Sequence, residues 1–293
     1  MSLESLMGAV QRLNASTEAL AALGAELRLR RDGTQADPQT RQLLQNILRG
    51  IDPSLLDGVS PQQEAVALAV IGAGFHYAVD LLEDPARAPG WRHQDPAVLQ
   101  TIGRMSTRIV HQIDAFAARR PALHKMLTSP GAFLDIGTGV GWLAIEAAQV
   151  WPALKVVGLD IWEPSLQLAR ANIATTGMQE RVSLRKRSIV DLDDKEVFAV
   201  VWYPSPFLPL AIAPAAMENA YHALVPGGWL VFGMFSAPDP LGEALMALRT
   251  VRCGGYPWKV PEVKERLLRL GFEEIEAVAP GSVSTLVVGR KPV

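Results

Sequence analysis

The sequence predicts an α/β fold, in which a mostly parallel sheet follows an all-helical segment. Three observations predict it. Short apolar runs alternate with helical patterns from residue 126 onward, which is typical of parallel sheets. The first 125 residues are rich in Ala, Leu, Gln and Arg and show few strand signals. The apolar run Phe133–Ile136 leads directly into three glycines at alternate positions, which indicates a buried strand that turns sharply into a helix.

Composition limits the classes of partner. Among 293 residues, 28 Lys and Arg balance 30 Asp and Glu, for a net charge of −2, so we expect neither a nucleic-acid nor a membrane partner. The single cysteine, Cys253, excludes a disulfide framework. No secretory signal is evident, and Ala65–Leu82 contains His76, Tyr77 and Asp80, which favours a buried helix over a membrane span. We therefore expect a cytoplasmic protein.

Residues 1–125 are expected to form an all-helical cap or dimerisation domain. Ser60 reads as an N-cap, with Gln63 completing a capping box. The proline-rich stretch Asp84–Asp95 is expected to be a loop. The helices are expected at Ser16–Arg31, Pro38–Arg49, Pro61–Glu83, Pro96–Arg119 and from Pro121 to just before Ser129.

Two roles are open for this helical domain. It could be a scaffold through which a homodimer forms, or a lid that completes a substrate pocket, because binding sites favour domain junctions. His76 and Tyr77 lie in an otherwise apolar helix, and a His with Asp80 four residues on could act as a general base. A His76–Asp80 pair with only a structural role is the simpler interpretation. His76 and Tyr77 are nevertheless the best candidates for catalytic residues in this domain.

Residues 126–293 are expected to form the ligand-binding domain. The predicted strands are Ala132–Ile136, Lys155–Asp160, Val182–Arg187, Phe198–Tyr203, Trp229–Met234, Glu273–Val278 and Thr285–Arg290. The predicted helices are Gly141–Val150, Pro164–Thr175, Pro214–Leu224 and Pro261–Leu270. The last two strands, joined at Pro280-Gly281-Ser282, are expected to form an antiparallel hairpin.

An open parallel sheet binds ligands beyond the carboxyl ends of its strands. The glycine loop, Asp160, Ser188 and Tyr203 all follow such ends and should converge on one crevice. An acid 19 residues after Gly141 suits a ribose diol, which leaves a nicotinamide dinucleotide or S-adenosylmethionine. The glycines follow G-x-G-x-G rather than the dinucleotide pattern, and Asp135 would repel a pyrophosphate but could hold an amino group.

These stretches together resemble the class I S-adenosylmethionine-dependent methyltransferases over nearly all of residues 126–293. The matching segments are Phe133–Gly141, Val157–Asp160, Leu166–Asn172 and Leu224–Leu230. The resemblance implies a Rossmann-like, seven-stranded sheet with one antiparallel strand, flanked by helices, and S-adenosylmethionine as the cofactor.

The resemblance also implies a role for each cofactor-binding residue. Asp135 and the backbone of Gly137, Thr138, Gly139 and Gly141 should hold the methionine part. Asp160 should bind the ribose hydroxyls and Ile161 should pack on the adenine. Ser188 and Ile189 stand where the family often has an acid and an apolar residue near the adenine, so Ser188 departs from the pattern.

The segment after the fourth predicted strand bears on the chemistry. Ser205-Pro206-Phe207 loosely resembles the loop of methyltransferases that act on nitrogen, and it lacks the acid that a metal-dependent enzyme would place there. We therefore expect no metal. Aromatic faces attract cations such as a sulfonium, so Tyr203 and Phe207 are expected to face the crevice as catalytic residues, with Tyr203 also in contact with the cofactor.

The sequence therefore predicts an S-adenosylmethionine-dependent methyltransferase that acts on a small molecule, in specialised metabolism. One alternative is a cyclase that consumes the cofactor to give azetidine-2-carboxylate and methylthioadenosine, a reaction that needs no acceptor pocket. A second alternative is a non-catalytic protein that binds the cofactor or a partner.

Overall fold

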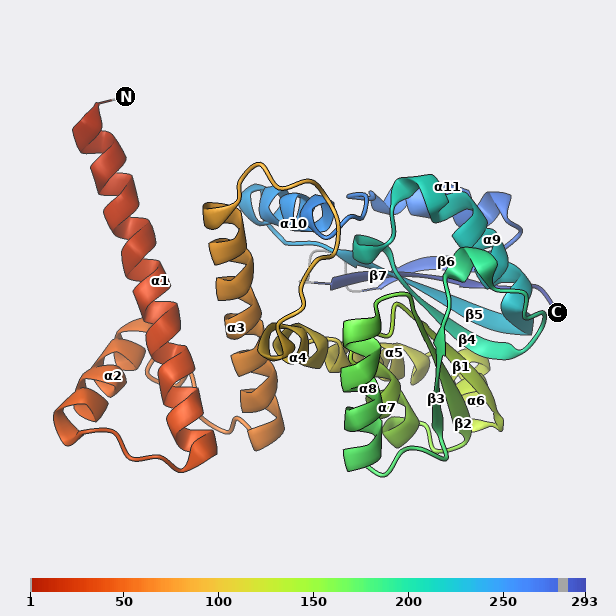
Figure 1. Ribbon diagram of the computed structural model, residues 1–293, viewed down its shortest axis with the longest axis horizontal. Helices are drawn as coiled ribbons and strands as arrows, with labels where there is room; N and C mark the ends of the chain where they lie inside the picture. Colours follow the sequence, from red (N-terminus) through yellow and green to blue (C-terminus); the bar gives the residue numbers. More distant parts are fainter. Residues whose placement is uncertain (1, 279–283) are drawn as a thin grey trace. The chain divides into compact units, whose positions relative to one another are not determined.

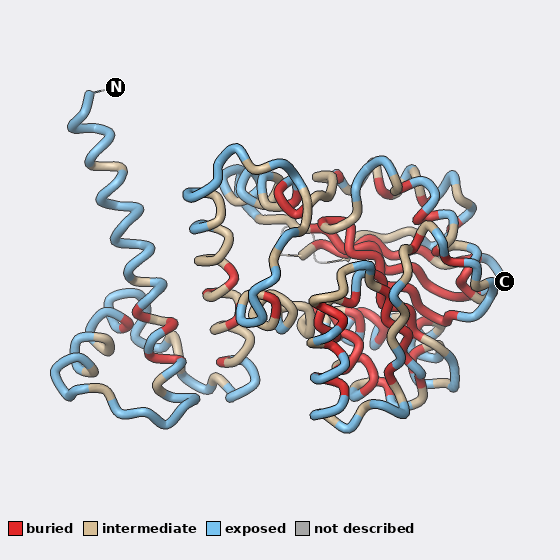
Figure 2. The backbone as a smooth tube through the Cα atoms, in the orientation of Figure 1, coloured by how far each residue is buried: buried red, intermediate tan, exposed pale blue. Residues whose placement is uncertain are grey.

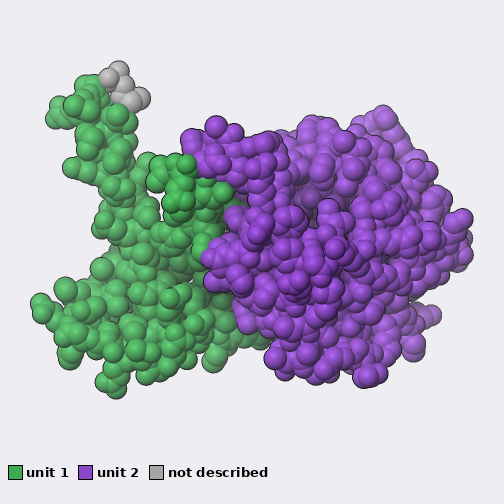
Figure 3. Space-filling model, viewed as in Figure 1, with its two compact units in different colours: residues 1–83 green, residues 84–293 purple. Residues whose placement is uncertain are grey.

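The computed structural model describes residues 2–278 and 284–293. The chain divides into two compact units, Met1–Glu83 and Asp84–Val293, shown in different colours in Figure 3. The predicted division at residue 125 remains a prediction. The three helices that follow Asp84 cluster with the second unit, because they pack on its helices and sheet.

Unit 1 contains three helices. They are α1 (Leu3–Asp32), α2 (Pro38–Ile51) and α3 (Pro61–Glu83). The predicted capping box at the start of α3 is present: the backbone N–H of Ser60 donates to Gln63 Oε1 at 2.8 Å, and the Ser60 hydroxyl accepts from the backbone of Gln63. α1 approaches α3 closely at Gly24, where a Cβ would lie 3.2 Å from the side chain of Ile71.

The first turns of α1 extend the predicted helix by 13 residues, and their apolar side chains are exposed. Among the described helices, only α3 has the length and apolar composition to cross a membrane. Of its most apolar 18-residue window, 17% is buried. That property alone is weak evidence for a membrane span, since core helices of other proteins share it. The sequence predicted a buried helix over Ala65–Leu82, but most residues of α3 are only partly buried.

Unit 2 begins with helices that brace the sheet. They are α4 (Pro96–Arg104), α5 (Thr107–Ala117) and α6 (Pro121–Thr128). The predicted single helix over 96–119 is therefore wrong. It breaks after Arg104, where the hydroxyl of Ser106 donates to the carbonyl of Gly103 at 2.6 Å and competes with the helical hydrogen bonds.

The sheet of unit 2 has the predicted seven strands in the order β3-β2-β1-β4-β5-β7-β6 (Figure 1). Strand β7 alone runs antiparallel to its neighbours, as predicted. The turn predicted at Pro280-Gly281-Ser282 lies outside the described residues. The strands are β1 (Gly131–Ile136), β2 (Leu154–Asp160), β3 (Val182–Lys186), β4 (Phe198–Pro204), β5 (Leu224–Phe235), β6 (Glu273–Val278) and β7 (Ser284–Arg290).

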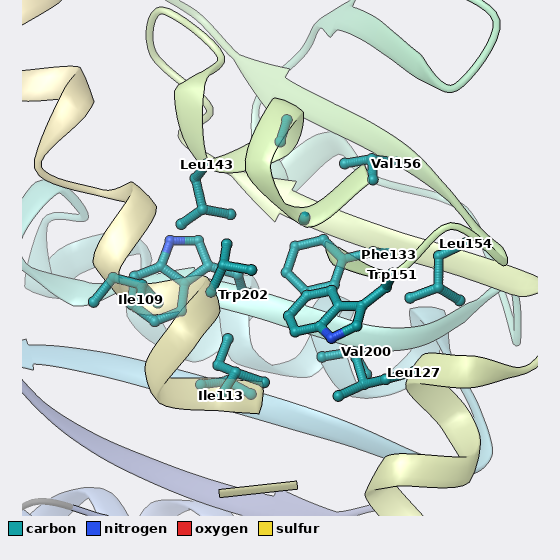
Figure 4. Close-up of a cluster of buried hydrophobic side chains, with 14 of the residues drawn as sticks. Ile109, Ile113, Leu127, Phe133, Leu143, Trp151, Leu154, Val156, Val200 and Trp202 are labelled. Atoms are coloured by element: carbon teal, nitrogen blue, oxygen red, sulfur yellow. The ribbon is translucent and has the colours of Figure 1, made fainter. Parts of the chain in front are cut away.

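Helices cover both faces of this sheet, and alternate residues of each strand point to opposite faces. On β4, Val200 and Trp202 enter one core with α5, α6 and α7 (Trp142–Val150), and Figure 4 shows part of this core. Val201 and Tyr203 enter the other core with α9 (Ala213–Ala223) and α11 (Val260–Arg269). Figure 2 shows how burial concentrates in these central strands, which accounts for their continuous apolar sequences.

Two further features of unit 2 differ from the prediction. Helix α10 (Pro240–Arg252) was not predicted; Asp239 caps it by accepting from the backbone of Gly242 at 2.9 Å. Strand β5 starts at Leu224, before the Pro226-Gly227-Gly228 segment, because Gly227 turns within the strand at φ +78° while pairing continues on both sides. Helix α8 (Glu163–Thr175) matches its prediction to within one residue.

Candidate functional site

The carboxyl edge of the sheet brings the predicted cofactor residues together. β1 lies between β2 and β4, and all three strands run parallel. The chain leaves β1 toward β2 on one side, while β4 lies on the other side, so the switch in strand order falls at the end of β1. The glycine loop stands at that point, with Asp160 at the end of neighbouring β2.

The glycine loop has a conformation that only glycine adopts readily. Gly137, Gly139 and Gly141 have φ values of +64°, +56° and +83°. At Gly141, where α7 begins, a Cβ would also lie 3.3 Å from Ala169 of α8. The backbone N–H groups of Thr138, Gly139 and Gly141 donate to Leu159, Asp160 and Thr138, which fixes the loop. The first turn of α7, which begins at this loop, supplies the positive end of the helix dipole.

Asp135 is a fully buried acid beside this loop. Its Oδ2 accepts a hydrogen bond of 2.7 Å from the hydroxyl of Thr138. The pKa of Asp135 is raised to about 7, chiefly because the carboxyl is buried; the Thr138 hydrogen bond opposes this rise and the nearby carboxylate of Asp160 adds to it. Asp135 can therefore take up or release a proton near neutral pH, depending on the charge of what lies against it.

Asp160 ties the end of β2 to the glycine loop. Its Oδ2 accepts from the backbone N–H of Gly139 at 2.7 Å, and its Oδ1 accepts from that of Trp162 at 2.8 Å. Burial raises the pKa of Asp160, and these backbone hydrogen bonds partly oppose the rise. A carboxylate has about four lone-pair positions, so both oxygens can still accept hydrogen bonds from a diol.

Helix α4 braces the glycine loop from outside the sheet. Gln100 accepts from the indole N–H of Trp142 at 2.6 Å and donates to Asn172 at 3.0 Å. Asn172 in turn donates to the carbonyl of Val140 at 2.8 Å. Asn172 ends the segment Leu166–Asn172, which resembles the methyltransferases in sequence. Its side chain therefore supports the glycine loop rather than a ligand.

We expect Gly103→Ala to weaken both folding and cofactor binding. A Cβ at Gly103 would lie 2.2 Å from Cγ2 of Val140, inside the glycine loop, so α4 or the loop must shift. Overpacking of this kind costs about 1–3 kcal/mol. Thermal unfolding and calorimetric titration with S-adenosylmethionine would measure the two effects. Gly74→Ala on α3 is the control, because a Cβ there meets nothing within 4 Å. A Gly103→Ala protein that matches wild type in both assays would contradict this account.

A strap formed by residues 84–95 crosses the same edge (Figure 1). Near one end, the backbone N–H of Gly90 donates to the carbonyl of Arg252 at 3.2 Å, and the Arg87 guanidinium donates to the same carbonyl. Toward the other end, the indole N–H of Trp162 donates to the carbonyl of His93 at 3.0 Å. The strap thus spans from the end of α10 to the end of β2.

Aromatic rings meet where the strap passes the ends of β4 and β5. The rings of Trp91 and Phe207 lie edge to face with centroids 5.4 Å apart, and those of Phe207 and Phe235 do so at 5.9 Å. The His93 ring lies 4.9 Å from that of Trp91. Phe207 therefore stands at the carboxyl edge, and its partners come from segments that the sequence analysis did not select.

The expected position of the Tyr203 side chain is wrong. Tyr203 is fully buried, and its ring stacks on that of Phe232 with centroids 4.8 Å apart, in the core beneath α9 and α11. Strand alternation causes this placement, since Tyr203 shares its face with Val201. Burial raises the pKa of the Tyr203 hydroxyl, so this phenol stays protonated.

The three residues predicted near the adenine have different environments. Ile161 follows Asp160 and is 68% exposed, so its apolar surface is available at the crevice. The Ser188 hydroxyl caps a short 3-10 helix by accepting from the backbone of Val190 at 3.4 Å. Ile189 is buried in the core, although it directly follows Ser188. Of the three, Ile161 is the best placed to pack on a planar ring.

His76 and Tyr77 both lie on α3, in unit 1. Their catalytic roles remain predictions, because Asp135, the glycine loop and Asp160 all belong to unit 2. Within the described residues, no group of three or more His, Cys, Asp or Glu side chains is arranged to hold a metal ion.

A cavity of about 230 Å³ lies beside the ends of β4 and β5. Helix α10 and the segment leading to α11 enclose it, and the lining includes Ser205, Phe235, Ser236, Thr250, Tyr256 and Trp258. Apolar rings with a few hydroxyl groups are typical of small-molecule sites. Tyr256 and Trp258 lie on the segment between α10 and α11, and the sequence analysis did not predict α10, which forms the opposite wall.

Part of the chain is similar to known protein families. Residues 133–228 match a family described as a methyltransferase domain. The O-methyltransferase imqG of Aspergillus flavus is 30% identical over 118 residues, which cover 40% of this chain and 48% of that protein. The malonyl-[acyl-carrier protein] O-methyltransferase of Geobacter sulfurreducens is 27% identical over 56% of this chain and 66% of its own length. The chain thus matches less than two thirds of either relative.

Solved structures share the whole architecture at low identity. An O-methyltransferase family protein from Burkholderia thailandensis has a TM-score of 0.65 at 13% identity, over 100% of this chain and 98% of its own. Human N-acetylserotonin methyltransferase, solved with S-adenosylmethionine, has a TM-score of 0.62 at 14% identity, over 100% and 99%. The pyocyanin biosynthetic protein PhzM has a TM-score of 0.63 at 17% identity, over 99% and 100%.

The glycine loop, the acid that ends β2, the strand order and the matched segment all lead to one assignment. Residues 133–228 form a methyltransferase domain, for which S-adenosylmethionine is the cofactor, and the chain shares with solved methyltransferases a fold in which helices precede a Rossmann-like core.

Proposed function

We propose that this protein transfers the methyl group of S-adenosylmethionine to a small-molecule acceptor, in specialised metabolism. The proposal rests on the cavity of about 230 Å³. Ser205, which directly follows β4, lines this cavity, so the cavity lies beside the carboxyl edge of the sheet. Its size suits a small metabolite rather than a protein segment. The biosynthetic neighbour PhzM and the O-methyltransferase imqG support an acceptor of this kind.

The residues of the edge fit the cofactor. The first turn of α7, with its free backbone donors and positive dipole end, suits the carboxylate of the methionine part. The buried acid Asp135 suits its ammonium group, and Asp160 has lone pairs for the two ribose hydroxyls. Ile161 offers an apolar surface to the adenine. We propose that Ser188 and Ile189 lie near the adenine ring but contact it less directly than Ile161 does.

The protein contributes alignment and the exclusion of water. When bound, the cofactor supplies a methyl group on a sulfonium, which is a good leaving group. The residues around the cavity must then hold the acceptor in line and keep the edge dry. A base is required only for an acceptor that arrives protonated, and the Ser205-Pro206-Phe207 segment contains no titratable side chain. His76 with Tyr77, on α3, and His93, in the strap, remain candidates for that role.

One observation favours a second function, cyclisation of the cofactor itself to azetidine-2-carboxylate and methylthioadenosine. The end of β4 brings aromatic rings rather than a base into the edge, as the contacts of Phe207 with Trp91 and Phe235 illustrate. Such an edge could enclose a folded-back aminobutyrate chain without any acceptor. The two functions differ in their products, so one assay separates them.

Incubation of the purified protein with S-adenosylmethionine alone, followed by mass analysis of the products, is the decisive assay. Methyl transfer predicts no turnover until an acceptor is added, and S-adenosylhomocysteine as the product thereafter. Methylthioadenosine with a cyclic amino acid would establish the cyclase instead. Cofactor binding without turnover across a panel of hydroxyl, amine and thiol acceptors would support the non-catalytic alternative. Asp160→Ala is the control for spontaneous cofactor decay.

We further propose that unit 1 forms a homodimer and that the protein acts in the cytoplasm. What supports the dimer is a stripe of exposed apolar side chains on α1, which consists of Leu3, Leu6, Val10, Leu13 and Leu20. Their spacing of three, four and seven residues is that of a coiled-coil seam. The nearby charges, Glu4, Arg12 and Glu18, nearly cancel, which does not favour an anionic membrane surface.

A further inference from the structure

The strap of residues 84–95 is fixed at both of its ends to the core of unit 2. Arg252 accepts from Gly90 and Arg87 through its carbonyl, and its own guanidinium donates to the carbonyl of Asp84 at 3.1 Å. A Cβ at Gly254 would lie 3.0 Å from the backbone of Gly90, so the two segments are in close contact. Near its far end, the strap is held by the indole of Trp162.

These anchors determine where the middle of the strap passes. Trp162 follows β2, whereas Phe207 and Phe235 follow β4 and end β5. In the sheet, β1 lies between β2 and β4, so a strap that contacts both sides must cross the end of β1. The glycine loop stands at that end, and a Cβ at its Gly137 would lie 3.4 Å from Pro204, two residues before Pro206-Phe207.

Trp91 sits in the middle of this crossing and forms an aromatic corner with Phe207 and Phe235. The two pairs of rings meet at interplanar angles of 85° and 84°, so they form walls at right angles rather than a stack. All three side chains are only partly buried, which leaves ring surface accessible. Phe235 also lines the cavity beneath α10, and Phe207 follows Pro204, which adjoins Gly137, by three residues, so the corner borders the cavity on one side and the segment beside the glycine loop on the other.

We propose that Trp91, with Phe207 and Phe235, binds the sulfonium of S-adenosylmethionine and makes Trp91 the residue that distinguishes the charged cofactor from its neutral product. This inference rests on the proposed function, which places the cofactor at this edge. The reactive sulfur must lie between the glycine loop and the acceptor cavity, which is where the corner stands. Aromatic faces attract a cation, and tryptophan does so most strongly, whereas the neutral thioether of S-adenosylhomocysteine lacks that attraction.

Calorimetric titration of wild type, Trp91→Leu and Trp91→Phe with both ligands tests the proposal. Trp91→Leu keeps an apolar side chain but removes the π face, so we expect the affinity for S-adenosylmethionine to fall about two- to thirtyfold. The affinity for S-adenosylhomocysteine should stay unchanged. Trp91→Phe should retain most of the preference for the sulfonium.

Trp162→Phe is the matched control, because it removes one hydrogen bond of the strap, the one to His93, and keeps the three rings and the anchors at Arg252. It should weaken both ligands by similar factors. If Trp91→Leu also weakens both ligands equally, or neither, then Trp91 is a packing residue and the proposal is overturned. If wild type binds neither ligand, the assignment of the cofactor fails, and that outcome is distinct from a failure of the corner.

Discussion

Asp160→Ala is expected to lower the affinity for S-adenosylmethionine by about a hundredfold or more while the protein remains folded. Hydrogen bonds to charged groups contribute about 1.5–3 kcal/mol each, and the variant loses two that would reach the ribose. It also releases the N–H of Gly139, which Asp160 holds at 2.7 Å. Calorimetric titration measures the affinity, and circular dichroism confirms the fold.

Asp193→Ala is the control for this experiment. Asp193 is also an acid in unit 2, but its side chain is 78% exposed and forms a surface ion pair with Arg187. We expect its replacement to leave cofactor affinity unchanged. An Asp160→Ala protein that binds S-adenosylmethionine as tightly as wild type would remove Asp160 from the cofactor site.

Asp135→Asn is expected to stabilise the free protein at pH 8 and to weaken its binding of S-adenosylmethionine. Burial raises the pKa of Asp135 to about 7, whereas the ordinary value is 3.8. Each pKa unit corresponds to 1.36 kcal/mol, so the buried charge costs up to about 4 kcal/mol above pH 7. Asparagine removes that cost, and its carbonyl oxygen can still accept from the Thr138 hydroxyl.

The sign of this effect follows from proton linkage. Between about pH 4 and pH 7 the folded state keeps a proton on Asp135 that the unfolded state has released, so wild-type stability falls as the pH rises through this window. Below pH 4 the carboxyl is neutral in both states and carries no cost. The stabilisation by Asp135→Asn should therefore be absent at pH 4, grow through the window and level off above pH 7.

Chemical unfolding of both proteins at several pH values measures this difference, and titration at pH 8 measures the loss of cofactor affinity. The affinity should fall because asparagine carries no charge to pair with the ammonium group of the methionine part. A variant that is less stable than wild type at pH 8 would show that Asp135 is not a strained acid in the free protein. Thr138→Val tests the hydrogen bond separately, since it leaves the carboxyl in place.

Much of the cofactor edge could be predicted from short stretches of sequence. The three glycines mark positive φ values that other residues rarely adopt, and Asp160 is at a strand end because it closes an apolar run. These are local signals, since a few consecutive residues fix both the turn and the side of the sheet on which it lies. The seven strands follow from the alternation of apolar runs and helical patterns, whereas their order in the sheet comes from the structure.

The part of the site proposed to hold the methyl acceptor could not be predicted from short stretches of sequence. Tyr203 was expected at the crevice because it lies near the end of β4, but the alternation of side chains along the strand directs it into a core. Helix α10 carries exposed Leu241, Leu245 and Leu248, so its apolar pattern does not distinguish a helix in the core from a loop at a pocket. Trp91 lies in a proline-rich stretch with no periodic pattern.

The sequence by itself determined the fold of residues 126–293, the glycine loop with Asp135 and Asp160, and through them the cofactor. Only the tertiary structure decided that Trp91 in the strap meets Phe207, and Phe207 meets Phe235, at the carboxyl edge of the sheet. The physical reason is the range of the interactions. A turn and its helix are fixed by neighbours in sequence, whereas the aromatic corner joins three segments more than a hundred residues apart at their extremes, which only the packing of the whole unit brings into contact.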